Sequence, residues 1–442
     1  YAGDPFRGRP GFPPSFPWIT SMSRLNQDLG LWQGVGLLST SLLGTGIFIV
    51  PATAAGIAGP SSLWAWPLLT LLVLPVALTF AQLGRRFPHA GGAPSLVGRA
   101  FGAPMEQAVA FLFLSVIGVG LPAALRMTSG FWHALYPLSD VQELAIQLGT
   151  LGLMLWLGQR PARASGRVQM VIALMILLTV AAIWWRGGLV SGPRGVPAPE
   201  AVDWGLIPPA LAVMFWCFVG LEAFTHLGEE FRRPERDFPL ALLLGVLLAG
   251  LVYWACAVAV VHFGVFGDER ANGASLPTLV ASLWGDGWLW LAALVGYLAC
   301  FASINIYLQG FARLIWSLAD EGKLPSALAA RNGQGVPATA LTWVVAACAL
   351  ATLVAWWQAT SMASLIRYAN GVFVLIYLLS MLSGVVLLRG GWRGMALLAT
   401  LLCALVLCML GMDTVYALSI LAILMVLGWL RRAPAPGDVP PA

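Results

Sequence analysis

Long apolar runs separated by short polar loops dominate this chain and restrict the folds that it can adopt. Several runs approach 20 residues, which is the length that an α-helix needs to cross a bilayer. Of the 442 residues, 59% are hydrophobic and 10% are charged, whereas soluble domains average about 25% charged residues. The chain is therefore predicted to be an all-α polytopic membrane protein.

The apolar runs predict about twelve transmembrane helices. The expected spans are 32–56, 62–83, 104–129, 142–159, 168–186, 206–227, 238–263, 288–316, 337–357, 363–388, 394–411 and 414–430. A short apolar stretch at 275–285 precedes the eighth span. We expect 1–30 to be a disordered or cytoplasmic tail and 432–442 to be a cytoplasmic tail; residues 1–21 lack the apolar segment of a signal peptide.

The basic residues indicate the orientation of these spans. With the N-terminus inside, most of the 24 Lys and Arg residues fall into cytoplasmic loops, as the positive-inside rule requires. Both termini are therefore expected in the cytoplasm. The net charge of +5 follows from this topology, so we expect the lipid bilayer and no nucleic acid as a partner.

Two of the expected spans carry small residues near their midpoints. Residues 44–46 are Gly-Thr-Gly in the first span, and residues 218–221 are Phe-Val-Gly-Leu in the sixth. Glycine destabilises a helix by about 1 kcal/mol relative to alanine, so a helix can open at such places. Interrupted spans at matching places in two halves of a chain are typical of secondary transporters, whose site lies between the broken helices.

Opened helices would present backbone groups to a cavity. The half-helix after 44–46 would offer free N–H groups to a carboxylate. The half-helix before 218–221 would offer carbonyl groups to an ammonium group. Together they predict a site for a free α-amino acid, although the glycines could instead serve only close helix packing.

The residues expected around this site are uncharged, which favours an apolar substrate side chain. The candidates are Leu43, Gly44, Thr45, Gly46, Leu121, Phe215, Trp216, Phe218, Val219, Gly220 and Tyr307. The aromatic ones could equally be packing residues. The hydroxyls of Ser39, Thr40 and Ser41 could contribute donors or bond to their own helix.

Glu222 lies deep within the sixth span, where an ionised carboxylate is costly. We expect it to take up and release a proton as access alternates, unless it only bonds a neighbouring helix. His226 follows one turn later and could share that proton or be structural.

Charged residues at the ends of spans suggest further roles. Arg85, Arg86, Glu229 and Glu230 could form ion pairs that close an inner gate, or could lie in solvated loops. Arg126 and Arg367 fall near outer ends of spans, and snorkelling to the interface explains them.

These motifs resemble those of the amino acid–polyamine–organocation transporter superfamily. The resemblance is carried by residues 44–48, 218–222, 229–230, 234–239 and 319–325. More narrowly, the chain resembles bacterial exporters of methionine and branched-chain amino acids from about Met22 to about Leu430. The matching stretches include 36–48, 62–67, 120–125, 213–224, 296–307 and 368–373.

The resemblance implies a LeuT-like fold of five plus five helices in inverted repeats, at 31–186 and 206–388, with two more helices at 393–431. It implies proton-driven export of neutral amino acids across a bacterial inner membrane. Thr45 and Gly46 would hold the carboxylate and the Val219 carbonyl the amine, with Trp216 and Tyr307 gating or lining the pocket. Arg126, Arg367 and residues 1–21 depart from the family pattern.

Other transport functions and a channel would each require particular features of the sequence. An importer or exchanger would use the same site, a polyamine transporter would need more pocket carboxylates than Glu222, and a channel would need continuous polar stripes. His226 and Glu229 have no evident third metal ligand, and the six cysteines lie in apolar runs without metal spacing. We expect no enzyme activity, no cofactor and no metal, and a monomer or homodimer.

Overall fold

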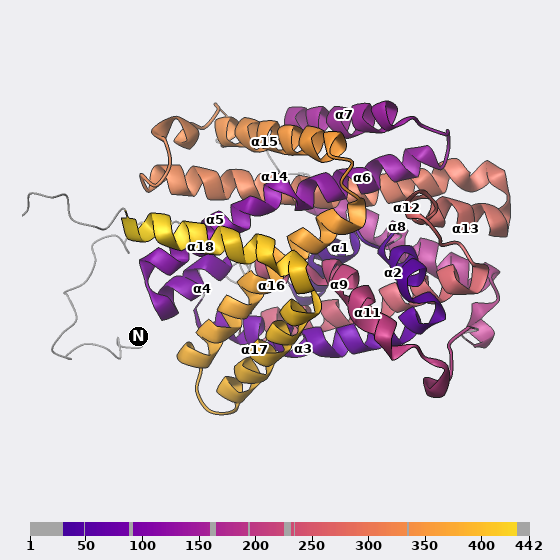
Figure 1. Ribbon diagram of the computed structural model, residues 1–442, viewed down its shortest axis with the longest axis horizontal. Helices are drawn as coiled ribbons and strands as arrows, with labels where there is room; N and C mark the ends of the chain where they lie inside the picture. The colour runs from indigo at the N-terminus through magenta and orange to yellow at the C-terminus, as the bar shows by residue number, and fades with distance from the viewer. Residues whose placement is uncertain are drawn as a thin grey trace, which may run out of the picture.

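A computed structural model describes residues 30–47, 49–87, 92–159, 165–192, 195–224, 231–233, 235–333 and 336–430. This part of the chain is built of helices (Figure 1). Of the tails expected at 1–30 and 432–442, only Gly30 lies within it. His226, Glu229 and Glu230 also lie outside the described residues.

The α-helices follow the apolar runs of the sequence. Their bounds are α1 (Leu31–Leu43), α2 (Val50–Ala58), α3 (Ser62–Arg86), α4 (Gly92–Phe101), α5 (Ala103–Leu114), α6 (Gly120–His133), α7 (Asp140–Gly158), α8 (Ser165–Arg186), α9 (Ile207–Met214), α10 (Leu221–Phe224), α11 (Asp237–Phe263), α12 (Glu269–Gly273), α13 (Ser275–Trp284), α14 (Leu289–Asp320), α15 (Ala338–Trp357), α16 (Met362–Leu387), α17 (Gly391–Met409) and α18 (Thr414–Leu430). Among the 3-10 helices, η3 (Ser115–Gly118) and η7 (Phe215–Phe218) are placed inside spans.

Within the described residues, nine helical segments are long and apolar enough to cross a membrane, and shorter apolar helices accompany them. The chain is thus a polytopic membrane protein. Each of the twelve expected spans coincides with helix, but three of them are divided. The span at 32–56 becomes α1 and α2, the span at 104–129 becomes α5, η3 and α6, and the span at 206–227 becomes α9, η7 and α10.

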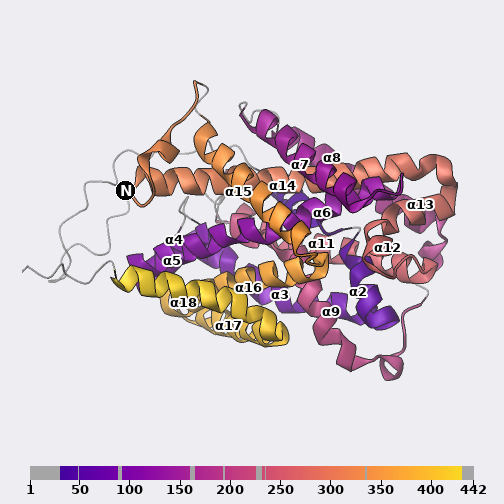
Figure 2. The same cartoon turned by 45° about the horizontal axis from the view of Figure 1, so that its top comes forward.

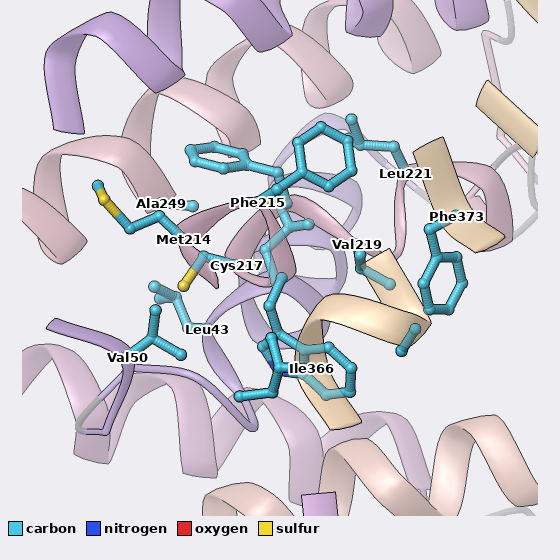
Figure 3. Packing of buried hydrophobic residues seen from close by; sticks show 14 of the residues in the cluster. Leu43, Val50, Met214, Phe215, Cys217, Val219, Leu221, Ala249, Ile366 and Phe373 are labelled. Carbon is cyan, nitrogen blue, oxygen red and sulfur yellow. The ribbon is translucent and has the colours of Figure 1, made fainter. Parts of the chain in front are cut away.

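The divided spans meet in the buried centre of the bundle. α1 and α3 both pack along α11, and α9 packs against α2. Leu43 and Val50, on either side of the first interruption, belong to the same buried cluster as Phe215 and Cys217 (Figure 3). Bulky rings such as Trp66 and Tyr253, stacked with centroids 5.1 Å apart, fill this centre and fix the ends of the interrupted helices.

α12 and α13 form a short helical pair between α11 and α14. Both views place them at the same end of the molecule as α2 (Figures 1 and 2). α12 contacts both α2 and α6. This pair corresponds to the apolar stretch expected at 275–285 and the loop before it.

Candidate functional site

The first helix break separates α1 from α2. α1 ends at Leu43, residues 44–47 form turns, and α2 begins at Val50. The Tyr253 hydroxyl donates to the Leu42 carbonyl over 2.7 Å, so the end of α1 is satisfied by a side chain of α11. A Cβ at Gly44 would lie 2.6 Å from Cβ of Ser303, which is why only glycine allows this approach of α14.

The second helix break lies between η7 and α10. Val219 is extended, with φ −71° and ψ 131°, and Gly220 has φ +125°. This positive φ is easily reached only by glycine. The backbone therefore leaves helical geometry within the stretch 218–221, as the sequence pattern indicates.

Trp216 connects the two breaks. Its indole Nε1 donates to Oγ1 of Thr45 over 3.0 Å, and only 8% of the residue is exposed. The Cys300 thiol donates to the Thr45 carbonyl over 3.7 Å. Residue 45 is thus held from two sides, by η7 and by α14.

Glu222 lies just beyond the second break and is 2% exposed. Its Oε2 accepts the Gly220 N–H over 3.0 Å and a hydrogen bond from the Tyr377 hydroxyl, and its Oε1 accepts from the Tyr307 hydroxyl over 3.4 Å. Oη of Tyr377 also lies 3.2 Å from the Phe218 carbonyl oxygen. The carboxyl group therefore ties the start of α10 to α14 and α16.

A cavity of about 20 Å³ lies beside both breaks. Its lining residues are Ser41, Thr45, Val116, Gly120, Leu121, Ala124, Trp216, Val219, Ser303, Ile304, Tyr307 and Phe373. A cavity of this size holds little more than one water molecule. An amino acid can therefore bind there only if lining side chains move apart.

The structure distributes the residues expected at the site over two groups. Five of them line the cavity: Thr45, Leu121, Trp216, Val219 and Tyr307. The others surround it as buried core or as the glycines of the breaks: Leu43, Gly44, Gly46, Phe215, Phe218 and Gly220. Of the serines considered, Ser41 lines the cavity, whereas Ser39 is buried, and its hydroxyl has no hydrogen-bond partner among the described residues.

A third helix break contributes lining residues that the sequence analysis missed. α5 ends at Leu114, η3 covers Ser115–Gly118, and α6 begins at Gly120. Val116, Gly120 and Ala124 line the cavity from this side. The pair Gly118 and Gly120, near the middle of the expected span 104–129, was the signal available for it.

The end of the molecule at which α1 begins is filled by three phenylalanines. Phe224, Phe231 and Phe238, here called the phenylalanine cluster, are buried with ring centroids 5.5–5.9 Å apart. Arg85 pairs with Glu235 over 3.6 Å, but the Glu235 side chain is 82% exposed, and Arg86 is exposed beside it.

Arg126 and Arg367 have acidic partners rather than free, snorkelling side chains. Arg126 lies 3.6 Å from Glu269 on α12 and donates to the Ala355 carbonyl over 3.3 Å. Arg367 Nε donates to Oδ2 of Asp413 over 2.7 Å. Both pairs depend on residues distant in sequence.

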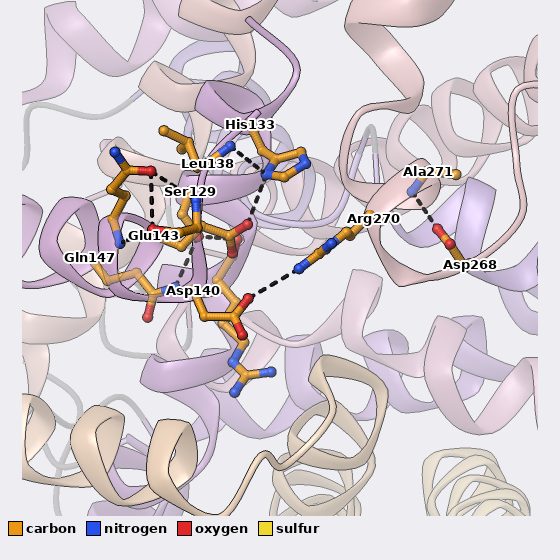
Figure 4. A network of polar contacts seen from close by, with 12 residues as sticks. Ser129, His133, Leu138, Asp140, Glu143, Gln147, Asp268, Arg270 and Ala271 are labelled. Carbon is orange, nitrogen blue, oxygen red and sulfur yellow. Dashed lines mark hydrogen bonds and ion pairs between the residues drawn. The ribbon is translucent and has the colours of Figure 1, made fainter. Parts of the chain in front are cut away.

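Further polar contacts join α6, α7 and α12 (Figure 4). Arg270 pairs with Asp140 over 3.1 Å, and His133 lies 3.0 Å from Glu143. Together with Arg126–Glu269, the Arg270–Asp140 pair ties α12 to α6 and α7. We call these two pairs the α12 ion pairs.

Comparison of the sequence with known proteins identifies its family. The profile described as "Amino acid permease" matches residues 29–433. The L-methionine/branched-chain amino acid exporter YjeH of Escherichia coli (strain K12) is 51% identical over 416 residues, which cover 94% of this chain and 99% of that protein. The uncharacterized amino acid permease YecA of Bacillus subtilis (strain 168) is 27% identical over 394 residues, 87% of this chain and 91% of YecA. The branched-chain amino acid permease BcaP of Bacillus subtilis (strain 168) is 21% identical over 344 residues, 72% of each chain. This chain therefore belongs to the amino acid permease family.

Proposed function

We propose that this protein is a secondary active transporter that exports methionine, leucine, isoleucine and valine across a bacterial inner membrane in exchange for protons. The observation that carries the proposal is the cavity between two helix breaks, joined by Trp216 and Thr45 and adjacent to the buried Glu222. The similarity to the Escherichia coli exporter over nearly the whole chain supports the substrate class.

The two breaks supply complementary partners for an α-amino acid. Backbone N–H groups at Thr45 and Gly46, where α2 approaches, would bind the carboxylate. The carbonyl of Val219, extended beside the cavity, would accept hydrogen bonds from the ammonium group. The remaining lining includes Leu121, Ile304 and Phe373, so the substrate side chain would meet apolar surface.

The architecture that suits this function has twelve membrane-spanning helices in two inverted repeats, 31–186 and 206–388, followed by two helices at 393–431. The breaks in the first span of each repeat support it. With both termini cytoplasmic, the phenylalanine cluster lies at the inner end and α12 at the outer end.

Glu222 is the proposed proton carrier. It contacts Tyr307, and Tyr307 lines the cavity, so a proton on the carboxyl and a substrate in the cavity would influence each other. A desolvated carboxylate in a membrane is costly unless it is protonated or paired. His226 is proposed as a second acceptor of the same proton.

Transport into inside-out vesicles tests this function. Vesicles with an acidic interior should accumulate labelled leucine and methionine, and a protonophore should abolish the accumulation. Accumulation of arginine or putrescine instead would refute the substrate class. Gradient-driven uptake by right-side-out vesicles alone would show an importer.

A further inference from the structure

Trp216 extends across the cavity from the first helix break to the third. At one end its Nε1 donates to Thr45 Oγ1 over 3.0 Å. At the other end its Cη2 lies 3.7 Å from the place that a Cβ of residue 120 would occupy. The indole is thus confined between Thr45 and the backbone of Gly120.

Gly120 owes its place to space rather than to backbone conformation. It is the buried first residue of α6, and its φ is not in the left-handed region. A Cβ there would lie 2.6 Å from Cγ1 of Val116 and 3.5 Å from Cβ of Ala369. Because a contact under 3.0 Å forces a neighbour to shift, any larger residue displaces Val116.

The displaced groups border the cavity and can shift into it. Val116 and Trp216 both line the cavity, whereas Ala369 of α16, which also contacts the added Cβ, is fully buried. A valine side chain has few allowed rotamers, so its methyl group cannot simply rotate away. The indole cannot retreat without losing its bond to Thr45. A methyl group at position 120 would therefore reduce the cavity.

We propose that Gly120 is a specificity-determining residue, which sets the length of substrate side chain that fits between Val116 and Trp216. This inference rests on the proposed function, since it assumes that the cavity receives the side chain of an amino acid. It predicts that the third helix break selects substrates by size, while the first and second breaks hold the groups common to all amino acids.

Gly118 provides a matched control. It belongs to the same break, is exposed and does not line the cavity. The nearest atom to a Cβ there is the Tyr416 hydroxyl oxygen at 3.8 Å, an ordinary contact. Gly118→Ala therefore adds the same methyl group two residues away without reducing the cavity.

The experiment measures counterflow of labelled alanine, valine, leucine and methionine in proteoliposomes that contain the full chain. Gly120→Ala should lower the methionine-to-alanine ratio of transport rates about 10-fold, the scale of discrimination by one methyl-sized change in an apolar pocket. Gly118→Ala should leave the ratio within about 2-fold of wild type. Val116→Ala combined with Gly120→Ala should restore the ratio, because it removes the contacting methyl group.

Val116→Ala alone guards against a folding defect in Gly120→Ala. It should enlarge the cavity and raise the ratio of phenylalanine to alanine transport rates, for which labelled phenylalanine is added to the four amino acids. The role of Gly120 would be refuted if the methionine-to-alanine ratio were unchanged in Gly120→Ala and the phenylalanine-to-alanine ratio were unchanged in Val116→Ala, with the wild type active. The proposed function would then remain intact. A wild-type protein that moves none of the four amino acids would refute both.

Discussion

The two ends of the molecule are closed by different chemistry. At the end near α1, the phenylalanine cluster excludes water with three buried rings. At the other end, α12 is held by the α12 ion pairs, whose side chains are partly exposed; those of Arg126 and Glu269 are 22% and 43% exposed. We therefore call the end near α1, whose aromatic contacts are buried, the dry end, and the α12 end, whose ion pairs reach solvent, the wet end.

The dry end depends on glycines that let the rings approach the backbone. A Cβ at Gly34 would lie 2.5 Å from the ring of Phe231, and a Cβ at Gly84 would lie 2.9 Å from that of Phe238. Each buried phenylalanine contributes about 1.5–3 kcal/mol relative to exposure in water. Opening this end requires α1 to move away from the cluster, or α10 to carry Phe224 away from Phe231 and Phe238.

The wet end depends on one close backbone contact and on charges. A Cβ at Gly130 of α6 would lie 3.3 Å from Cα of Gly273, so α12 packs directly on α6. Ion pairs that reach solvent contribute about 0–1 kcal/mol each and weaken with salt. The comparison therefore predicts that the α12 end opens at lower cost than the phenylalanine end.

The largest effect should come from preventing a backbone change at the second helix break, which lies between the two ends. Gly220→Val places a β-branched residue at φ +125°, with its Cβ 3.0 Å from Ser41 Oγ. Transport should fall below detection while the protein remains inserted, as measured by leucine counterflow and by membrane yield. Gly310→Val, at an exposed position of α14 with no atom within 4 Å of its Cβ, is the control and should stay active. Full activity of Gly220→Val would show that the second break only packs helices.

The second largest effect should come from changing Glu222, the proposed proton carrier that would couple the two ends. Glu222→Gln keeps the shape of the side chain but cannot release a proton, so leucine counterflow should persist while accumulation driven by a pH gradient is lost. Glu106→Gln, on α5 and away from the cavity, should retain both activities. Gradient-driven accumulation at the wild-type level in Glu222→Gln would contradict this role.

A smaller effect should follow from removing one ring of the phenylalanine cluster at the dry end. Phe231→Ala should lower the free energy of unfolding by about 3 kcal/mol, as large-to-small core substitutions do. It should also make a cysteine introduced at Ser41 react faster with a thiol reagent added from the cytoplasmic side. Phe231→Leu should have the same direction and less than half the size. Unchanged reactivity in both variants would show that the cluster does not close this end.

The smallest effect is expected at the wet end. Glu269→Gln removes the charge facing Arg126 but can still accept the Met362 N–H, which lies 2.8 Å from Glu269 Oε1. Exchange rates should change by no more than about 5-fold, and the difference should vanish in 0.5 M salt, roughly the regime where surface pairs are screened. Glu235→Gln removes the exposed partner of Arg85 and should have no effect at either salt concentration. A salt-independent change in Glu269→Gln would assign it to packing rather than to charge.

The sequence predicts some of these features and not others, for physical reasons. The breaks at 44–46 and 218–221 are local events, caused by glycines that can be recognised in place. The break at Ser115–Gly118 was missed because the other two breaks were identified from their matching places in the two halves of the chain, a signal that this third break does not give.

Partners distant in the chain could not be predicted. Tyr377 reaches Glu222 across 155 residues, and Glu269 reaches Arg126 only because α12 folds onto α6. The ion pairs expected at an inner gate involve Arg85 and Arg86, of which Arg85 has a described and exposed partner, Glu235. The phenylalanine cluster closes the dry end through tertiary packing, because Phe231 contacts Gly34 from the other half of the chain.

α16 holds both sides of the second helix break. Asn370 is fully buried, and its Nδ2 donates to the Ala212 carbonyl over 2.7 Å, before the second break. Tyr377, seven residues later on the same helix, bonds to Glu222 after that break. Seven residues make two turns and about 10 Å of rise, so both side chains project from one face of α16. α16 is thus a rigid spacer that fixes the gap between α9 and α10, and α10 can pivot while α9 stays in place only after Glu222 releases both Tyr377 and Tyr307.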